Sequence, residues 1–381
     1  MNDKFFRRNW RLIVGLACYS IAGLAAASDP SQIIASTHQG VEYRVGLGSC
    51  LRQDLDMPIW SAVHDRQPDS FIFMGDNVYA DIGRYKRMDQ PDNFDAAYQA
   101  LADRSEFSAF RSAMAESGRP LLATWDDHDY GLNDGGTDYP HKLAAKRAFL
   151  NFFSTVTPAV ASLDEAGIYN AKTVVTGNGL VVQFILLDTR SFRSSMERRK
   201  NNELCQRGGW EFMTDADATV LGETQWQWLE KELTKPADVR LLVSSIQVLP
   251  TEQCFEKWSN FPQERERLFS LIQETKANGV VLLSGDRHLS EISVLDREDF
   301  AYPLYELTSS GLNSALNGRF DSDNEPNDLR ALPNNITVDS FGEIDIVGHA
   351  AEFELILRLL SESGEILQVL PIPARQLAVL P

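Results

Sequence analysis

The chain is poor in basic residues. Its 381 residues include 36 Lys and Arg against 54 Asp and Glu, which gives a formal net charge of −18. A surface with this excess of negative charge repels polyanions at long range. The composition therefore argues against a stable nucleic-acid complex. A site for a phosphate group would need positive charge supplied locally, as bound metal cations would do.

Long apolar runs are also missing beyond the N-terminal region. Residues 12–27 form one such run, which follows four basic residues and ends in Ala25-Ala26-Ala27. The run is shorter than the roughly 20 residues of a membrane-spanning helix, and its small residues resemble a signal-peptidase site. We expect residues 1–27 to be a signal peptide cleaved before Ser28, which leaves no membrane span. The alternative is an uncleaved anchor.

Export is the expected consequence of this segment. The protein would be periplasmic or secreted, by the Sec route or, given Arg7-Arg8, by the twin-arginine (Tat) route.

Cysteine is scarce, with four in the whole chain. Cys18 lies in the expected signal peptide, which leaves Cys50, Cys205 and Cys254. An exported protein meets an oxidising compartment, where cysteines can pair. We expect Cys205 to pair with Cys254 and Cys50 to remain a thiol. The alternative is that none of the three pairs.

The chain does contain a regular alternation of short β-branched apolar runs with amphipathic patterns, and no internal repeat. Near-continuous apolar runs are typical of strands covered on both faces. The expected strands are 43–50, 70–76, 121–127, 180–188, 239–247, 280–286 and 305–309, and the expected helices are 94–114, 141–153, 223–233 and 263–277.

The rest of the chain completes one expected α/β domain over residues 28–381, with its core at 43–311. Residues 352–359 and 366–371 flank Glu362-Ser-Gly-Glu365 and predict a terminal antiparallel hairpin. The polar segments 189–219 and 313–345 are expected to be long loops, which in compact domains often bind ligands.

Four of the expected strands end in side chains that can bind metals. The strand ends are Gly48-Ser49-Cys50, Gly75-Asp76-x-x-Tyr79, Trp125-Asp126-Asp127-His128-Asp129 and Ser284-Gly285-Asp286-x-His288. Loops at the carboxyl ends of strands in open α/β sheets converge on ligands, so these side chains are expected to share one cleft. Hard anionic oxygens suit Fe(III), Mn or Ca, whereas thiolate and imidazole favour softer transition metals. The mixed set implies two or more ions, which can clamp a phosphoryl group.

These motifs resemble those of the PhoD-like alkaline phosphatases, a branch of the calcineurin-like metallophosphatases. Glu223-Thr-Gln225-Trp226 and the segment from Trp258 to Arg265 also resemble that family, and the matches run in order from about residue 44 to about 311. The resemblance implies an α/β fold built as a four-layer α/β/β/α sandwich with the metals at one end. The family's best-known members carry an additional N-terminal β domain, which we do not expect here.

The resemblance also implies the roles of individual residues. The expected ligands of an iron ion, Fe(III), are Cys50, Asp76, Tyr79 and His288. Asp76 would bridge to a second ion, often Ca(II), completed by Asp127, Asp286 and Asn133. The alternatives are other divalent transition metals such as Mn, Zn or Co. His128 stands where the wider superfamily has the histidine that protonates the leaving oxygen.

The expected activity is hydrolysis of small-molecule or polymer phosphomonoesters, phosphodiesters or both. The nucleophile would be a metal-bound hydroxide, and His128 would be the general acid. Arg287 is the candidate for binding the substrate phosphate. The alternative is a non-catalytic exported module that binds calcium or an anion on the same fold. The sequence predicts neither the preferred ester nor an oligomeric state.

Overall fold

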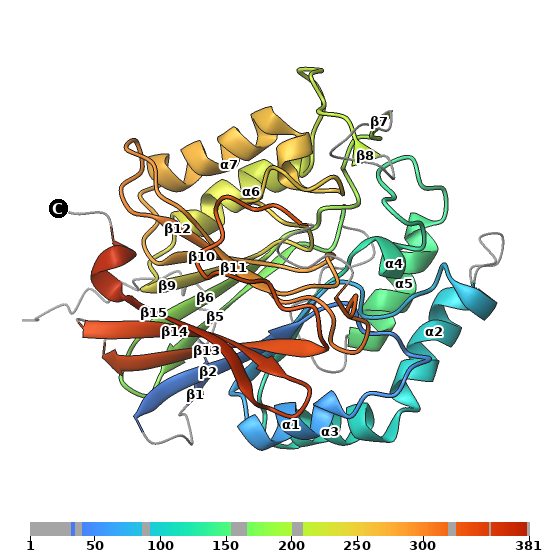
Figure 1. Cartoon of the computed structure of the whole chain (residues 1–381), viewed down its shortest axis with the longest axis horizontal. Coiled ribbons are helices and arrows are strands. Elements are labelled where there is room, and N and C mark those ends of the chain that lie inside the picture. The colour runs from blue at the N-terminus through green and yellow to red at the C-terminus, as the bar shows by residue number, and fades with distance from the viewer. Residues whose placement is uncertain are drawn as a thin grey trace, which may run out of the picture. The chain divides into compact units, whose positions relative to one another are not determined.

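Two β-sheets stack against each other at the centre of the chain (Figure 1). The first, in the order β15-β14-β13-β2-β3-β4, is built from β2 (Val41–Gly48), β3 (Ser70–Met74), β4 (Leu121–Thr124), β13 (Ser340–His349), β14 (Glu352–Ser361) and β15 (Ile366–Pro373). The second, in the order β1-β5-β6-β9-β10-β12-β11, is built from β1 (Gln32–Ile34), β5 (Asn170–Thr176), β6 (Val181–Leu186), β9 (Val239–Val243), β10 (Val280–Ser284), β11 (Glu291–Leu295) and β12 (Leu304–Thr308).

The computed structural model describes residues 32–34, 40–85, 92–153, 166–199, 209–318, 325–349 and 352–378. Residues 32–381 form one unit. The expected signal peptide, residues 1–27, lies outside the described residues. None of the described helices is long and apolar enough to cross a membrane.

Apolar side chains fill the space between the sheets. Val45 and Ile72 from the first sheet and Phe184 and Leu241 from the second belong to one fully buried cluster. The strands that carry them are buried along most of their length, as their near-continuous apolar sequences predicted. This cluster fixes the two sheets against each other and so fixes the distances between their strand ends.

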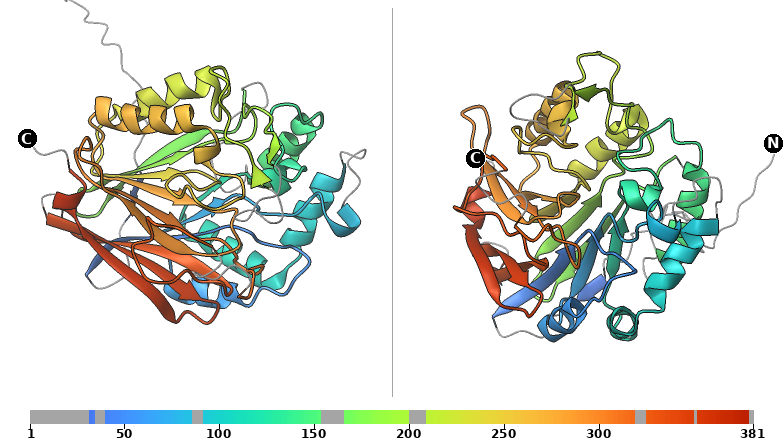
Figure 2. Two further views of the ribbon diagram at one scale, coloured as in Figure 1. Left: turned by 45° about the horizontal axis from the view of Figure 1, so that its top comes forward. Right: turned by 45° about the vertical axis from the view of Figure 1, so that its right-hand side comes forward.

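Helices cover the outer face of each sheet (Figures 1 and 2). The helices are α1 (Ile59–Arg66), α2 (Asp92–Ala102), α3 (Ser105–Glu116), α4 (Asp127–Tyr130), α5 (Lys142–Phe153), α6 (Gly222–Leu233) and α7 (Pro262–Glu274). Trp60, Phe107 and Phe149 from α1, α3 and α5 pack with the outer face of the first sheet. Trp226 of α6 and Leu268 of α7 cover the second sheet. The predicted four-layer α/β/β/α sandwich is therefore confirmed.

Two local predictions differ from the structure. The single helix expected over 94–114 is two helices, α2 and α3, because the chain is extended at Arg104, where φ is −76° and ψ is 120°. The break lets α2 pack on α5 while α3 packs on α1. The loop expected over 313–345 ends at Ser340, where β13 begins, while the terminal hairpin of β14 and β15 is confirmed.

The directions of the strands place the predicted ligands at one edge of each sheet. β2, β3 and β4 are parallel, so their carboxyl ends lie at one edge of the first sheet. In the second sheet β6, β9, β10 and β12 are parallel to one another. A tiny antiparallel ribbon, β7 (Arg198–Arg199) and β8 (Gly209–Trp210), lies within the expected loop 189–219.

Candidate metal centre

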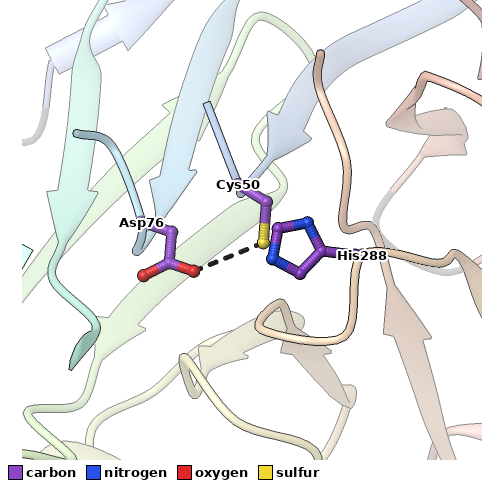
Figure 3. Close-up of side chains that lie close together, drawn as sticks. All are labelled: Cys50, Asp76 and His288. Atoms are coloured by element: carbon purple, nitrogen blue, oxygen red, sulfur yellow. Dashed lines mark hydrogen bonds between the residues drawn. The ribbon is translucent and has the colours of Figure 1, made fainter. Parts of the chain in front are cut away.

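The loops that follow β2, β3, β4 and β10 meet at one end of the sandwich. Figure 3 shows Cys50, Asp76 and His288 converging from three of these loops. The Cys50 Sγ lies 3.4 Å from Oδ2 of Asp76, although 26 residues separate them in the chain. The structure thus brings together Cys50, Asp76 and His288, which the sequence placed at the ends of three strands.

The backbone is strained at the positions of these side chains. The φ angles of Cys50, Asp76, Asp286 and His288 are 57°, 50°, 69° and 54°, in the left-handed region that non-glycine residues rarely adopt. Residues in such conformations cluster at functional sites, where the surrounding structure holds them in place. Strain at four of the expected ligands supports a functional site here.

The first group of donors contains a thiol, a phenol, an imidazole and a carboxylate. Cys50, Asp76 and His288 offer ligand atoms that lie within 4.8 Å of one another. The hydroxyl of Tyr79 lies 3.3 Å from Oδ2 of Asp76 and 3.2 Å from Nε2 of His288. Carboxylate and phenol oxygens with thiol sulfur and imidazole nitrogen form a donor set that a transition metal can use.

Burial favours the neutral forms of Cys50, Tyr79 and His288 when no cation is bound. It raises the pKa of the Cys50 thiol and of the Tyr79 phenol well above their usual values, and the Asp76 carboxylate adds to both effects. Burial lowers the pKa of His288 to about 4. Its Nδ1 lies 2.5 Å from the carbonyl oxygen of Ser314, so Nδ1 carries the hydrogen. The lone pair of Nε2 then accepts from the Tyr79 hydroxyl and can bind a metal ion.

The second group of donors consists of carboxylates around Asp127. Asp76 and Asp127 share one cluster with His128, and Asp127 shares a second cluster with Asp126 and Asp286. Asp76 therefore belongs to both groups, as a bridging ligand would. Oδ1 of Asp127 is buried and accepts no hydrogen bond from the described residues. A buried carboxylate oxygen without a donor is costly, and a hard cation would satisfy it.

Around Asp127 the electrostatic balance favours the ionised carboxylate. Burial alone would raise its pKa, but the charges of His128 and Arg190 and the N–H of Asp134 outweigh burial and lower the pKa to about 2. The N–H of Asp134 donates to Oδ2 of Asp127 over 2.6 Å. Asp127 is thus preset as an anionic ligand.

His128 is held beside both groups by contacts with Asp81 and Tyr79. Its Nδ1 lies 2.7 Å from Oδ1 of Asp81, and its ring lies 4.1 Å from that of Tyr79, centroid to centroid. Burial lowers the pKa of His128, but the carboxylates of Asp127 and Asp81 outweigh it and raise the pKa to about 10. A charged imidazole next to a metal site can protonate a leaving oxygen.

Buried residues behind the ligands hold the loops in place. Oδ1 of Asp126 accepts hydrogen bonds from Arg190 Nε and Ser245 Oγ, each over 2.6 Å. The Asp129 carboxylate accepts the N–H groups of Asn77 and Asp126. Asp129 therefore links the loop that carries Asp76 to the loop that carries Asp127.

Two expected site residues, Asn133 and Arg287, are not in the two groups of donors and instead contact neighbouring acids. Asn133 is exposed, and its amide donates to the Asp134 carboxylate; Asp134 shares a possible metal cluster with Asp127 and Glu256. Arg287 is 4% exposed, and its guanidinium forms an ion pair with Glu325.

The expected disulfide stays a prediction. Cys254 is disulfide-bonded and Cys50 is a buried thiol, whereas Cys205 lies outside the described residues.

Sequence reasoning missed several polar residues of the site. The residues, which all lie outside the four motifs, are Asp81, Asp134, Arg190 and Glu256. Their sequence signal is weak because each acts through a contact made only in the folded chain. Arg190 and Glu256, for example, are fully buried and paired over 2.6 Å, yet lie in segments that read as polar loop.

Comparisons with known proteins identify a family with a similar sequence. The sequence model of the PhoD-like phosphatase family matches residues 46–355. Alkaline phosphatase D of Bacillus subtilis (strain 168) is 25% identical over 243 residues, which cover 56% of this chain and 40% of that protein. The chain thus spans less than half the length of this relative.

Solved structures show the same fold. A structure of PhoD matches with a TM-score of 0.63 at 17% identity, covering 90% of this chain and 69% of that one. GAP50, described as the anchor in the inner membrane complex of Plasmodium, matches with a TM-score of 0.52 at 11% identity, covering 90% of each chain. At such identities the likeness concerns the fold alone. Because the family's sequence model spans most of the chain and its motifs form one cluster, the chain belongs to the PhoD-like phosphatase family.

Proposed function

We propose that this chain is an exported, metal-dependent phosphoesterase that hydrolyses phosphomonoesters, phosphodiesters or both. The observation that carries the proposal is the position of Asp76. Its carboxylate belongs both to the cluster with Cys50 and His288 and to the cluster with Asp127 and His128. A shared carboxylate between two donor groups is the arrangement that a two-metal hydrolase needs.

The two donor groups suit different cations. Cys50, Asp76, Tyr79 and His288 would hold Fe(III), because phenolate is a hard anionic donor and burial disfavours the ionised thiol and phenol without a strong cation. Asp76, Asp127 and Asp286 would hold Ca(II), which prefers oxygen ligands. Asn133 stays the predicted fourth ligand; to serve, its exposed amide would have to turn its oxygen to the ion and give up its hydrogen bond to Asp134. When bound, the ions would neutralise the charge of the phosphoryl group and activate the attacking water.

The protein's own side chains supply the remaining chemistry. His128 would donate its proton to the leaving oxygen, since its imidazole is charged and borders the shared cluster. Asp81 orients the ring by accepting the hydrogen of Nδ1, which leaves Nε2 for the substrate. The buried position of Asp76 and Asp127 excludes water from the ligands and strengthens their interactions with a cation.

Replacing Asp286 tests the proposal. Asp286→Ala removes a carboxylate from the second group, so turnover of an aryl phosphate and of a bis-aryl phosphate should be abolished. Asp286→Asn keeps the size but not the charge and should be nearly as inactive. Asp65→Ala, at an exposed acid on α1, is the matched control and should keep wild-type activity. Circular dichroism verifies the fold, and full turnover in a folded Asp286→Ala protein would refute the proposal.

Export is tested separately. With the native N-terminus, the mature protein should be recovered outside the cytoplasm and should begin at Ser28. Replacing Arg7-Arg8 with Lys-Lys distinguishes the routes, because twin-arginine export depends on this pair and Sec export needs only positive charge. Recovery of the full-length chain in the membrane would instead indicate an anchor.

The alternative is a non-catalytic module that binds calcium or an anion. A fold does not determine activity, and GAP50, described as an anchor, shares this fold. The Asp81–His128 pair favours the enzyme, because a calcium site has no use for a charged imidazole at its edge. The module would gain stability from calcium without cleaving any ester.

A further inference from the structure

The ribbon of β7 and β8 holds an exposed arginine in a fixed position. Arg198 and Trp210 lie directly opposite each other in the ribbon. The guanidinium carbon of Arg198 lies 3.8 Å from the centroid of the Trp210 ring, which is close stacking. The side chain of Arg198 is nevertheless 64% exposed. The guanidinium is therefore accessible to solvent while one of its faces stacks on the Trp210 ring.

The rest of the protein anchors this ribbon. The N–H of Trp210 donates to the carbonyl of Cys254, and the amide of Asn260 donates to the carbonyl of Trp210. A Cβ atom on Gly209 would lie 2.5 Å from the Cys254 carbonyl oxygen, so the backbones approach closely at this point. Trp210 is thus a fixed platform for Arg198.

Arg198 lies at the border of the metal centre. Its Nη2 is 3.5 Å from Oδ2 of Asp134. Asp134 in turn clusters with Asp127 and Glu256, with ligand atoms within 4.8 Å of one another. One carboxylate therefore separates the exposed guanidinium from a ligand of the second donor group.

Two other arginines near the centre, Arg287 and Arg190, are buried and paired with acids. Arg287 is 4% exposed and binds Glu325, and its guanidinium carbon lies 4.4 Å from the centroid of the Phe255 ring. Arg190 is fully buried between Asp126 and Glu256.

On the other flank, Arg52 lies 5.8 Å from the Tyr79 ring centroid, and two of its nitrogens donate to Asp54. Among the described residues, Arg198 contacts one ring and one carboxylate at 3.5 Å, and these contacts leave N–H donors of its guanidinium available.

We infer that Arg198, supported by Trp210, is the residue that binds an anionic oxygen of the phosphate ester in this site. The inference rests on the proposed function and adds a substrate-binding residue to it. A guanidinium presents paired N–H donors that match two phosphate oxygens, and stacking reduces the entropy lost on binding. In a chain with a net charge of −18, such a fixed cation also offsets repulsion of the substrate. The substrates favoured by it are dianionic phosphomonoesters over monoanionic diesters.

Steady-state kinetics of the metal-loaded enzyme test this inference. Arg198→Ala should raise KM for an aryl phosphate monoester about tenfold and for a bis-aryl diester by less, while kcat changes by less than about threefold. Arg198→Lys keeps the positive charge but loses the paired N–H donors of the guanidinium. Its KM for the monoester should therefore lie between those of the wild type and Arg198→Ala. Trp210→Phe keeps a ring and should lie closer to wild type than Trp210→Ala.

Arg297→Ala is the matched control. Arg297 also pairs with acids, Glu266 and Asp299, and its guanidinium carbon lies 4.5 Å from the Phe300 ring centroid, but it follows β11 outside the metal centre. Its removal should leave KM unchanged for both esters. An equal rise in KM for this control would show a general charge effect and overturn the assignment.

A binding measurement separates failure of this inference from failure of the proposed function. Calorimetric titration of metal-loaded protein with inorganic phosphate should show binding about tenfold weaker for Arg198→Ala than for wild type. If the wild type cleaves no ester but this difference appears, the proposed hydrolysis fails and the anion site stands. If the wild type cleaves esters while Arg198→Ala keeps wild-type KM and phosphate affinity, Arg198 only pairs with Asp134, and the inference is wrong.

Discussion

Oδ1 of Asp81 lies 2.7 Å from Nδ1 of His128, so a carboxylate that no motif contains orients the proposed general acid. Asp81 follows Asp76 by five residues, and the loop between them carries Tyr79. The loop that carries the proposed metal ligands Asp76 and Tyr79 thus also supplies the partner of His128. In the proposed mechanism, one loop therefore positions both the ligands and the general acid.

Asp81→Asn should slow cleavage according to the leaving group. Without the carboxylate, His128 is less well oriented and less readily charged, so its proton transfer is impaired. A poor leaving group such as an alkyl alkoxide needs that proton, and its kcat should fall about 10²-fold. An aryl oxide such as nitrophenolate needs it less and should lose much less. Equal losses for both leaving groups would contradict the assignment of His128.

Replacing Asp129 should destabilise the protein and loosen the site. Its carboxylate accepts the N–H groups of Asn77, Val78 and Asp126 and the hydroxyl of Tyr98. Asp129→Ala leaves these buried donors without an acceptor, so the free energy of unfolding should fall by about 2–4 kcal/mol in urea denaturation. Tyr98→Phe removes one donor and should cost about 1 kcal/mol. A smaller loss for Asp129→Ala than for Tyr98→Phe would refute this role.

Gly75 should be intolerant of a side chain for steric reasons. Its φ is +100°, and an added Cβ would lie 2.6 Å from Cβ of Asp126 and 2.9 Å from its backbone nitrogen. Gly179, with a φ of +90° and no atom within 4 Å of an added Cβ, is the matched control. Both Ala variants carry the conformational cost of about 1–2 kcal/mol, and Gly75→Ala should lose about 2 kcal/mol more in unfolding free energy. Equal losses would show that the close approach of the two loops is not tight.

Low pH should lower the stability of the folded protein, in part because Asp345 on β13 becomes protonated. Burial would raise the pKa of Asp345, but hydrogen bonds and charge from Arg44 and Arg358 outweigh it and lower the pKa below 3.8. A lowered pKa in the folded state contributes stability that is present above the unfolded pKa and is lost as pH falls through the folded one. The free energy of unfolding should therefore decrease as the pH is lowered below about 3.8. This decrease should be less steep in Asp345→Asn than in the wild type. Identical slopes would contradict this linkage.

The same residues explain why sequence reasoning missed β13. Glu343 and Asp345 are buried on this strand, which breaks the apolar pattern typical of a core strand. Arg44, Arg66 and Arg358 compensate these charges from β2, α1 and β14. Such compensation is visible only once the strands are paired. β3 and β10, in contrast, carry continuous apolar runs and were predicted from sequence.

The candidate site, like the fold, was predicted only where the signal is local in the sequence. Cys50, Asp76, Asp127, Asp286 and His288 stand at strand ends, where the order of elements brings them together. Asp81 belongs to a loop and Arg198 to the short β7–β8 ribbon, and the position of the ribbon depends on long-range contacts such as the one between Trp210 and Cys254. A local pattern does not specify these contacts, so residues that orient or bind through them were found only in the structure.

Elemental analysis of the native protein, purified without refolding, tests the two-metal centre most directly. The expected result is iron together with calcium in the wild type, with iron lost in Cys50→Ser and in Tyr79→Phe while both variants remain folded. Ester hydrolysis should fall with the iron content. A fully active protein that contains zinc alone, or one whose iron content is unchanged in both variants, would contradict the proposed role of Cys50 and Tyr79.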